Sequence, residues 1–82
     1  MTRRVRRVFC FVSFDETEDA MAAESYFKSC GIPGRLVPVP PVVNASCGLA
    51  WRCETGESEM VRKEMDTHSL RYSRFTPVEA FA

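Results

Sequence analysis

The stretch from Arg7 to Phe14 constrains the fold most, because it places apolar side chains on both sides of one short strand. Alternate residues of a strand point to the same face. Four side chains therefore share one face: Val8, Cys10, Val12 and Phe14. Phe9 and Phe11 share the other. We predict that helices cover the first face and that Phe9 and Phe11 form an exposed aromatic surface, a usual sign of a contact site.

A helix follows this strand directly. Asp15-Glu16-Thr17-Glu18 has the pattern of a capping box, in which Asp15 caps the helix and Glu18 reaches back to the backbone. Apolar residues then recur at helical spacing: Ala20, Ala23, Phe27 and Cys30. We expect Cys10 and Cys30 to face the core and to be unreactive. Gly31, followed by Ile32-Pro33, is typical of a left-handed helix end.

The rest of the chain repeats the alternation of strands and helices. The expected elements are a strand at Arg35–Val39, a strand at Cys47–Cys53, a helix from the turn at 54–58 to about residue 67, and a strand at Leu70–Phe75. Pro38 and Pro40 restrict the Arg35–Val39 strand to an edge of the sheet. On the strand that starts at Cys47, four side chains share one face: Cys47, Leu49, Trp51 and Cys53.

The order strand–helix–strand–strand–helix–strand predicts an α+β fold. For a chain of this size it indicates a ferredoxin-like βαββαβ sandwich, a four-stranded antiparallel sheet with two helices on one face. We interpret residues 1–82 as a single domain, with 1–6 as a basic N-terminal extension and 76–82 as a C-terminal tail. The uncovered sheet face is expected to form a homodimer or a docking surface.

Composition excludes several classes of function. The formal net charge is zero, so neither nucleic acid nor an anionic membrane is an expected partner, and the arginines at 3, 4, 6 and 7 are interpreted as a solvated N-terminus. The chain has no apolar run of a membrane span and no signal-peptide pattern, which predicts a cytoplasmic protein. Four cysteines without a CxxC spacing and a single His68 favour free thiols over a metal site, and no cofactor is expected.

Cys47 is the candidate chemical residue. A proline-rich loop, Pro38 to Ser46, delivers Cys47 and Gly48 into an apolar strand, and a glycine there allows another backbone or a ligand to approach. Such a thiol can be a nucleophile or a group carrier, or it can be a buried apolar side chain; the sequence leaves both interpretations open. Cys53 lies roughly 20 Å away along the strand, too far for a redox pair. His68 is either a helix-end residue or a base, and without a positioned base a thiol enzyme ranks last.

Three stretches carry a family resemblance: Ala20 to Ile32, Leu36-Val37-Pro38-Val39-Pro40, and Ser46-Cys47-Gly48-Leu49-Ala50. Together they resemble the small bacterial domains described as selenium/sulfur carrier protein-like. The resemblance implies a carrier that is not an enzyme. It places a persulfide or selenosulfide on Cys47 and assigns the supporting loop to Pro38, Pro40, Ser46 and Gly48. It also implies a sulfur- or selenium-donor protein, such as a cysteine desulfurase, as partner.

The alternative is an interaction or regulatory module in which Cys47 and Gly48 serve only to pack the loop. Exposure of the Cys47 sulfur separates the two hypotheses, since a carrier needs an accessible thiol. The carrier hypothesis predicts that an alkylating reagent modifies Cys47 faster than Cys10 and Cys30.

Overall fold

The computed structural model describes residues 6–43 and 47–81 of the chain. Its elements are β1 (Arg6–Ser13), α1 (Thr17–Cys30), β2 (Arg35–Pro38), β3 (Leu49–Glu54), the short 3₁₀ helix η1 (Thr55–Glu57), α2 (Ser58–Thr67) and β4 (Arg74–Phe81). Apart from η1, this is the predicted order of strands and helices. Within the described part of the chain, neither α-helix is both long and apolar enough to cross a bilayer.

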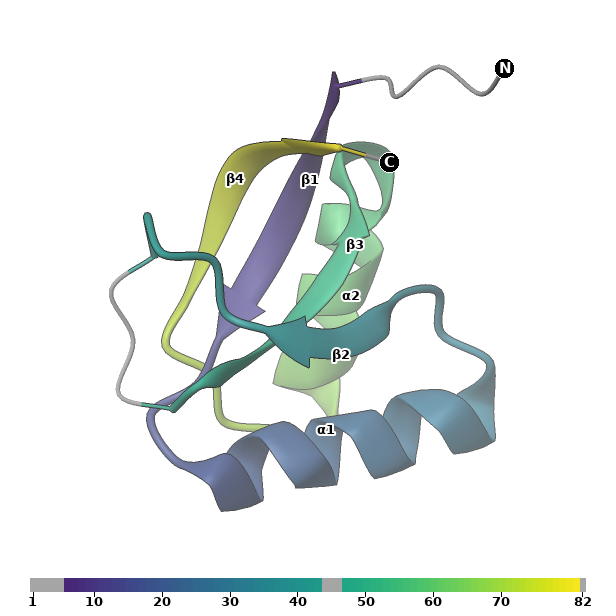
Figure 1. Ribbon diagram of the computed structural model, residues 1–82. Helices are drawn as coiled ribbons and strands as arrows, with labels where there is room; N and C mark the ends of the chain where they lie inside the picture. Colours follow the sequence, from purple (N-terminus) through teal and green to yellow (C-terminus); the bar gives the residue numbers. More distant parts are fainter. Residues whose placement is uncertain (1–5, 44–46, 82) are drawn as a thin grey trace.

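The four strands form one sheet in the order β2-β3-β1-β4, and every neighbouring pair is antiparallel. Figure 1 shows α2 behind the sheet and α1 along its lower end. The predicted ferredoxin-like α+β fold is confirmed. β2 lies at an edge, as its prolines require.

The main core lies between the sheet and the two helices. Its buried residues are Cys10, Val12 and Phe14 of the β1 region, Cys47, Trp51 and Cys53 in and before β3, and Ala20, Ala23, Phe27, Val61 and Met65 of the helices. The Phe27 and Trp51 rings lie 4.8 Å apart between their centroids. The predicted helix-facing side of β1 is therefore correct, except that Val8 at its start is 46% exposed.

Phe9 and Phe11 lie on the opposite face of the sheet, as predicted, but the expectation that they are exposed is wrong. Their exposed fractions are 6% and 4%. Ala50, Val37, Val39 and Val78 form a second apolar cluster with them. The guanidinium groups of Arg7 and Arg52 lie over the Phe9 ring, 5.3 Å and 4.8 Å from its centroid. Two guanidinium groups over Phe9 and three partly buried valines thus cover the apolar surface that was predicted to be exposed.

The two ends of α1 differ from each other in how well the sequence predicted them. Gly31 has φ 71°, and its N–H donates to the Phe27 carbonyl, so the left-handed end is confirmed. The Asp15 capping box is wrong, because the N-cap is Glu16 and no side chain caps the helix. Asp15 stands one residue too early to accept the first-turn N–H groups. A capping box forms instead before η1, between Glu54 and Glu57.

The last strand begins later than predicted. The expected strand at Leu70–Phe75 is observed at Arg74–Phe81, so that most of the expected tail pairs with β1. After α2 the chain turns through Ser69, which has φ 55°, and the Leu70 N–H donates to the Met65 carbonyl at 2.8 Å. Leu70 and Tyr72, which follow this turn, pack against the main core. The residues after them then form the edge strand.

Candidate functional site

Cys47 lies two residues before β3, where three elements meet. Its N–H donates to the Phe14 carbonyl at 3.3 Å, just after β1. Its Sγ lies 3.7 Å from the Oγ1 of Thr17, the first residue of α1. The residue is 4% exposed. The structure therefore places this thiol in the core, against the start of α1. A carrier whose thiol is always accessible to solvent would show an exposed sulfur at this position, and that is not observed.

The loop that leads to Cys47 is closed by a few backbone contacts. Pro38, the last residue of β2, is paired with Leu49. Beyond this pair the Val39 N–H donates to the Gly48 carbonyl at 2.9 Å, and the Val43 N–H donates to the Pro40 carbonyl at 3.0 Å. Predicted loop residue Ser46 lies outside the described residues. Pro38, Pro40 and Gly48 are thus brought together with Cys47 at one end of the β2–β3 pair.

Gly48 is exposed, and a Cβ added to it would have no heavy atom within 4 Å. The expected close approach to Gly48 is therefore not made by this chain itself. The backbone beside Cys47 faces open space. Among the described residues, no atom occupies the space where a side chain at position 48 would begin.

The start of α1 sets the electrostatics around the sulfur. The free backbone N–H groups of a first helical turn carry partial positive charge and favour a nearby anion. Thr17 brings the Cys47 sulfur to that turn. Glu18 and Asp19 lie in the same turn and oppose an anion there. The Thr17 hydroxyl is thus the polar group that contacts the Cys47 sulfur, and two carboxylates lie in the same helical turn.

His68 does not supply a base for Cys47. It caps the C-terminal end of α2, and its ring lies 4.4 Å from that of Tyr26, centroid to centroid. Tyr26 and Thr17 are nine residues apart on α1, about 14 Å at the helical rise. Over residues 6–43 and 47–81, no group of three or more His, Cys, Asp or Glu side chains is placed to hold a metal ion.

The exposure of the other three cysteines differs in part from the prediction. Cys30 is exposed rather than on the core face, while Cys10 and Cys53 are buried and directly opposite each other on β1 and β3. Burial raises the pKa of Cys53 to about 12, with the neighbouring Cys10 and Glu57 adding to the effect. Burial also raises the pKa of Cys10. This thiol pair depends on the strand register, which no local signal in the sequence gives.

We expect alkylation of the folded protein to modify Cys30 first, then Cys47, and Cys10 and Cys53 last. Cys30 comes first because it is exposed. Cys10 and Cys53 come last because they lie within paired strands and burial raises the pKa of both thiols, whereas Cys47 lies before β3 at a loop–strand junction. Peptide mass spectrometry after timed labelling measures it. Labelling of Cys53 ahead of Cys47 would contradict the described packing.

Replacing Cys53 with valine should reduce the loss of stability at alkaline pH. The folded-state pKa of Cys53 lies above its ordinary value of 9.0. The unfolded chain therefore releases this proton first, and the contribution of Cys53 to stability is complete below about pH 9 and declines as pH rises towards 12. Urea unfolding from pH 8 upward measures the effect, and parallel curves for wild type and variant would contradict it.

Comparison with known proteins shows similarity to one family over most of the chain. The family model described as "Putative Se/S carrier protein-like" matches residues 9–77. No curated protein and no solved structure shows significant similarity to the chain. The match extends from β1 into β4 and includes the Cys47 loop and both helices. The chain therefore belongs to the Se/S carrier protein-like family.

Proposed function

We propose that this protein carries sulfur or selenium on Cys47 and delivers it to a partner protein. Family membership over residues 9–77 supports a carrier. The observation that carries the choice of residue is the junction at 47–48, where a thiol beside the first turn of α1 adjoins a glycine backbone open to solvent. Among the four cysteines, this combination occurs at Cys47, since Cys10 and Cys53 are interior strand positions and Cys30 ends a helix.

The proposed loading step exchanges one sulfur atom between two thiols. The Cys47 thiolate attacks the outer sulfur of a donor persulfide, the S–S bond of the donor breaks, and the donor leaves as a thiolate that takes up the Cys47 proton. The product is a persulfide on Cys47. Selenium follows the same balance, giving a selenosulfide. Delivery is the reverse exchange with an acceptor thiol, so neither an oxidant nor a cofactor is required.

Loading requires the Cys47 loop to open, because the thiol is 4% exposed. Opening would break the Val39–Gly48 and Val43–Pro40 hydrogen bonds and that of the Cys47 N–H to Phe14. Local opening of a loop costs less free energy than global unfolding. In the closed state the sulfur is shielded from solvent, which protects a labile persulfide between donor and acceptor.

The proposed donor is a cysteine desulfurase or a similar persulfide-forming protein, and the proposed location is the bacterial cytoplasm. The four cysteines are all free thiols in the structure. A reducing compartment keeps thiols in that state. The homodimer expected from an exposed Phe9–Phe11 surface is not part of the proposal, because both rings are covered.

A second candidate function is an interaction or regulatory module in which Cys47 only packs the loop. The burial of Cys47 and its contact with Thr17 favour this candidate. The two candidates differ in one chemical property, the ability of the folded protein to hold sulfane sulfur.

Chemical loading distinguishes them. The folded protein is incubated with inorganic polysulfide, freed of excess reagent, and treated with cyanide, which converts sulfane sulfur to thiocyanate. The carrier should yield thiocyanate in proportion to protein, and a Cys47→Ala variant should yield only the part held by exposed Cys30. Equal yields from both proteins would favour the packing module.

A further inference from the structure

The sheet face opposite the helices carries three arginines, one each from β1, β2 and β3, beside the carboxylate of Glu54. Arg7 lies on the β1 face that bears Phe9 and Phe11, because alternate residues of a strand share a face. Arg52 is the direct cross-strand partner of Phe11, and Arg35 is the direct partner of Arg52. Direct partners in a sheet project to the same side. We name Arg7, Arg35 and Arg52 the arginine face.

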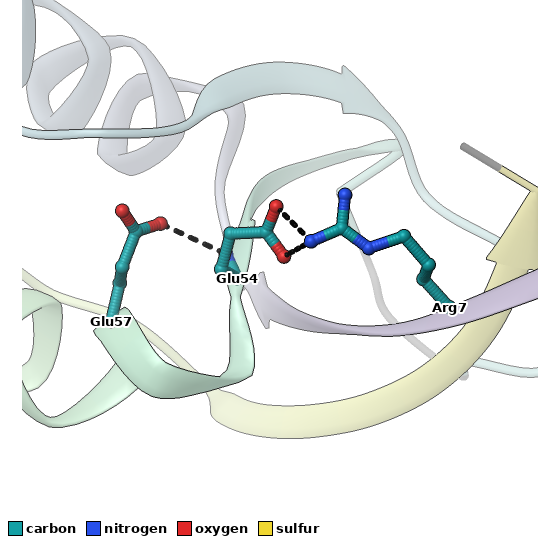
Figure 2. A network of polar contacts seen from close by, with 3 residues as sticks. All are labelled: Arg7, Glu54 and Glu57. Carbon is teal, nitrogen blue, oxygen red and sulfur yellow. Dashed lines mark hydrogen bonds and ion pairs between the residues drawn. The ribbon is translucent and has the colours of Figure 1, made fainter.

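One carboxylate on this surface is already engaged. Figure 2 shows the Arg7 guanidinium bridging both carboxylate oxygens of Glu54, with Nη2 lying 2.6 Å from Oε1, while Glu57 accepts a hydrogen bond from the Glu54 N–H at 3.1 Å. Across the described residues, no ion pair joins Arg35 or Arg52 to a carboxylate. Arg7 is thus neutralised by Glu54, and two guanidinium groups remain.

These two guanidinium groups repel each other and border a depression. Like charges directly opposite in a sheet are destabilising, and Arg52 is further fixed over the Phe9 ring at 4.8 Å. The depression has a volume of about 230 Å³ and is lined by Phe9, Gly34, Arg35, Arg52, Cys53, Glu54 and Glu57. A carboxylate placed between Arg35 and Arg52 would relieve the repulsion.

Charge complementarity selects an acidic protein segment as the occupant. RNA is disfavoured, because Phe9 and Phe11 are buried and offer no ring on which a base can stack. Glu54 and Glu57 also line the depression, so an RNA with a phosphate on every nucleotide would meet carboxylates as well as arginines. An acidic peptide can place separate carboxylates on Arg35 and Arg52 without passing over Glu54 and Glu57.

We propose that the arginine face is the docking surface for an acidic segment of the protein that exchanges sulfur with Cys47. This inference rests on the proposed function for the identity of the partner. Cys47 precedes Arg52 by five residues along the β3 direction, about 17 Å at the strand rise. Cys47 itself lies on the helix side of the sheet. A segment docked at Arg35 and Arg52 would therefore hold the partner while its thiol reaches Cys47 around the end of the β2–β3 pair, past the exposed Gly48.

Titration with two model ligands, followed by amide NMR, tests the docking surface. The probes are a capped hexaglutamate peptide and a six-nucleotide oligouridylate, each at low and at physiological ionic strength. We expect the peptide to shift amides around Arg35 and Arg52, more strongly at low salt. Arg35→Glu should weaken its binding about fivefold, in line with one partly exposed ion pair. Lys63→Glu makes the same change of charge at an exposed position of α2 and should leave binding unchanged.

Four outcomes would overturn the proposal. The first is that the peptide does not bind, and the second is that Arg35→Glu and Lys63→Glu weaken peptide binding equally. The third is that the oligouridylate binds more tightly than the peptide. The fourth is that the amide shifts at this face depend only on protein concentration, which would indicate self-association. Polysulfide loading of Cys47 needs no docking. A protein that loads sulfur but ignores the peptide therefore contradicts this inference alone, and one that binds the peptide but holds no sulfur contradicts the proposed function alone.

Discussion

Replacing Gly34 with alanine should destabilise the protein by at least about 3 kcal/mol, through backbone strain and overpacking. Gly34 has φ 124°, a conformation that residues with a side chain rarely adopt. A Cβ there would lie 2.6 Å from the Arg52 carbonyl oxygen and 2.8 Å from Cε2 of Trp51. Neither neighbour can move cheaply, because Trp51 is 2% exposed and its Nε1 donates to the Pro33 carbonyl at 3.2 Å.

The loss of stability expected for Gly34→Ala is large relative to the total stability of the domain. A domain of this length has a total stability of roughly 4–12 kcal/mol, and the loss corresponds to about 12 °C or more in Tm. Thermal unfolding followed by circular dichroism measures it. Gly56→Ala is the matched control, since nothing lies within 4 Å of a Cβ at that position, and its Tm should stay near that of wild type. Similar Tm values for both variants would show that the tight contact of Gly34 with Trp51 is not formed.

Replacing Cys47 with serine should abolish sulfur uptake from a protein donor while leaving the fold intact. Serine keeps the shape of the side chain, and its hydroxyl has Thr17 Oγ1 close by, 3.7 Å from the position of the sulfur. The stability change should stay within the 0.5–3 kcal/mol or so of an ordinary core substitution. The loss of uptake should be complete, because a hydroxyl forms no persulfide.

Cys30→Ser is the control for uptake. Cys30 is the exposed cysteine and the easiest target for unspecific sulfuration, so its removal should lower the background and leave donor-dependent uptake unchanged. Intact-mass spectra of both variants after incubation with a cysteine desulfurase and cysteine measure the difference. Donor-dependent uptake that follows Cys30 instead of Cys47 would reassign the carrier.

Local patterns were sufficient for the architecture. The alternation in β1 gave the side that faces the helices, and Gly31 gave the end of α1, because both depend on neighbouring residues alone. The prolines at 38 and 40 gave the edge position of β2 for the same reason. The late start of β4 was missed because the residues at 70 and 72 are used by the turn after α2, a contact with the core that no local window contains.

The candidate site was less predictable, since it depends on contacts between distant residues. The cover over Phe9 comes from Arg7 and Arg52, which the β1–β3 register brings together across more than forty positions of sequence. Cys47 contacts Phe14 and Thr17, which precede it by 33 and 30 positions in the sequence. The tight packing of Gly34 appears only once Trp51 is placed in the core. Membership of the family could be predicted from the sequence, whereas the burial of Cys47 could not.

Donor-dependent transfer mapped to a single peptide tests the central claim most directly. The wild-type protein is incubated with a cysteine desulfurase and cysteine, trapped with an alkylating reagent, digested, and analysed by mass spectrometry for the cysteine that carries one additional sulfur. The proposed function predicts the added sulfur on the peptide that contains Cys47, dependent on the desulfurase. No added sulfur, or sulfur distributed according to exposure with Cys30 first, would contradict a carrier role for Cys47.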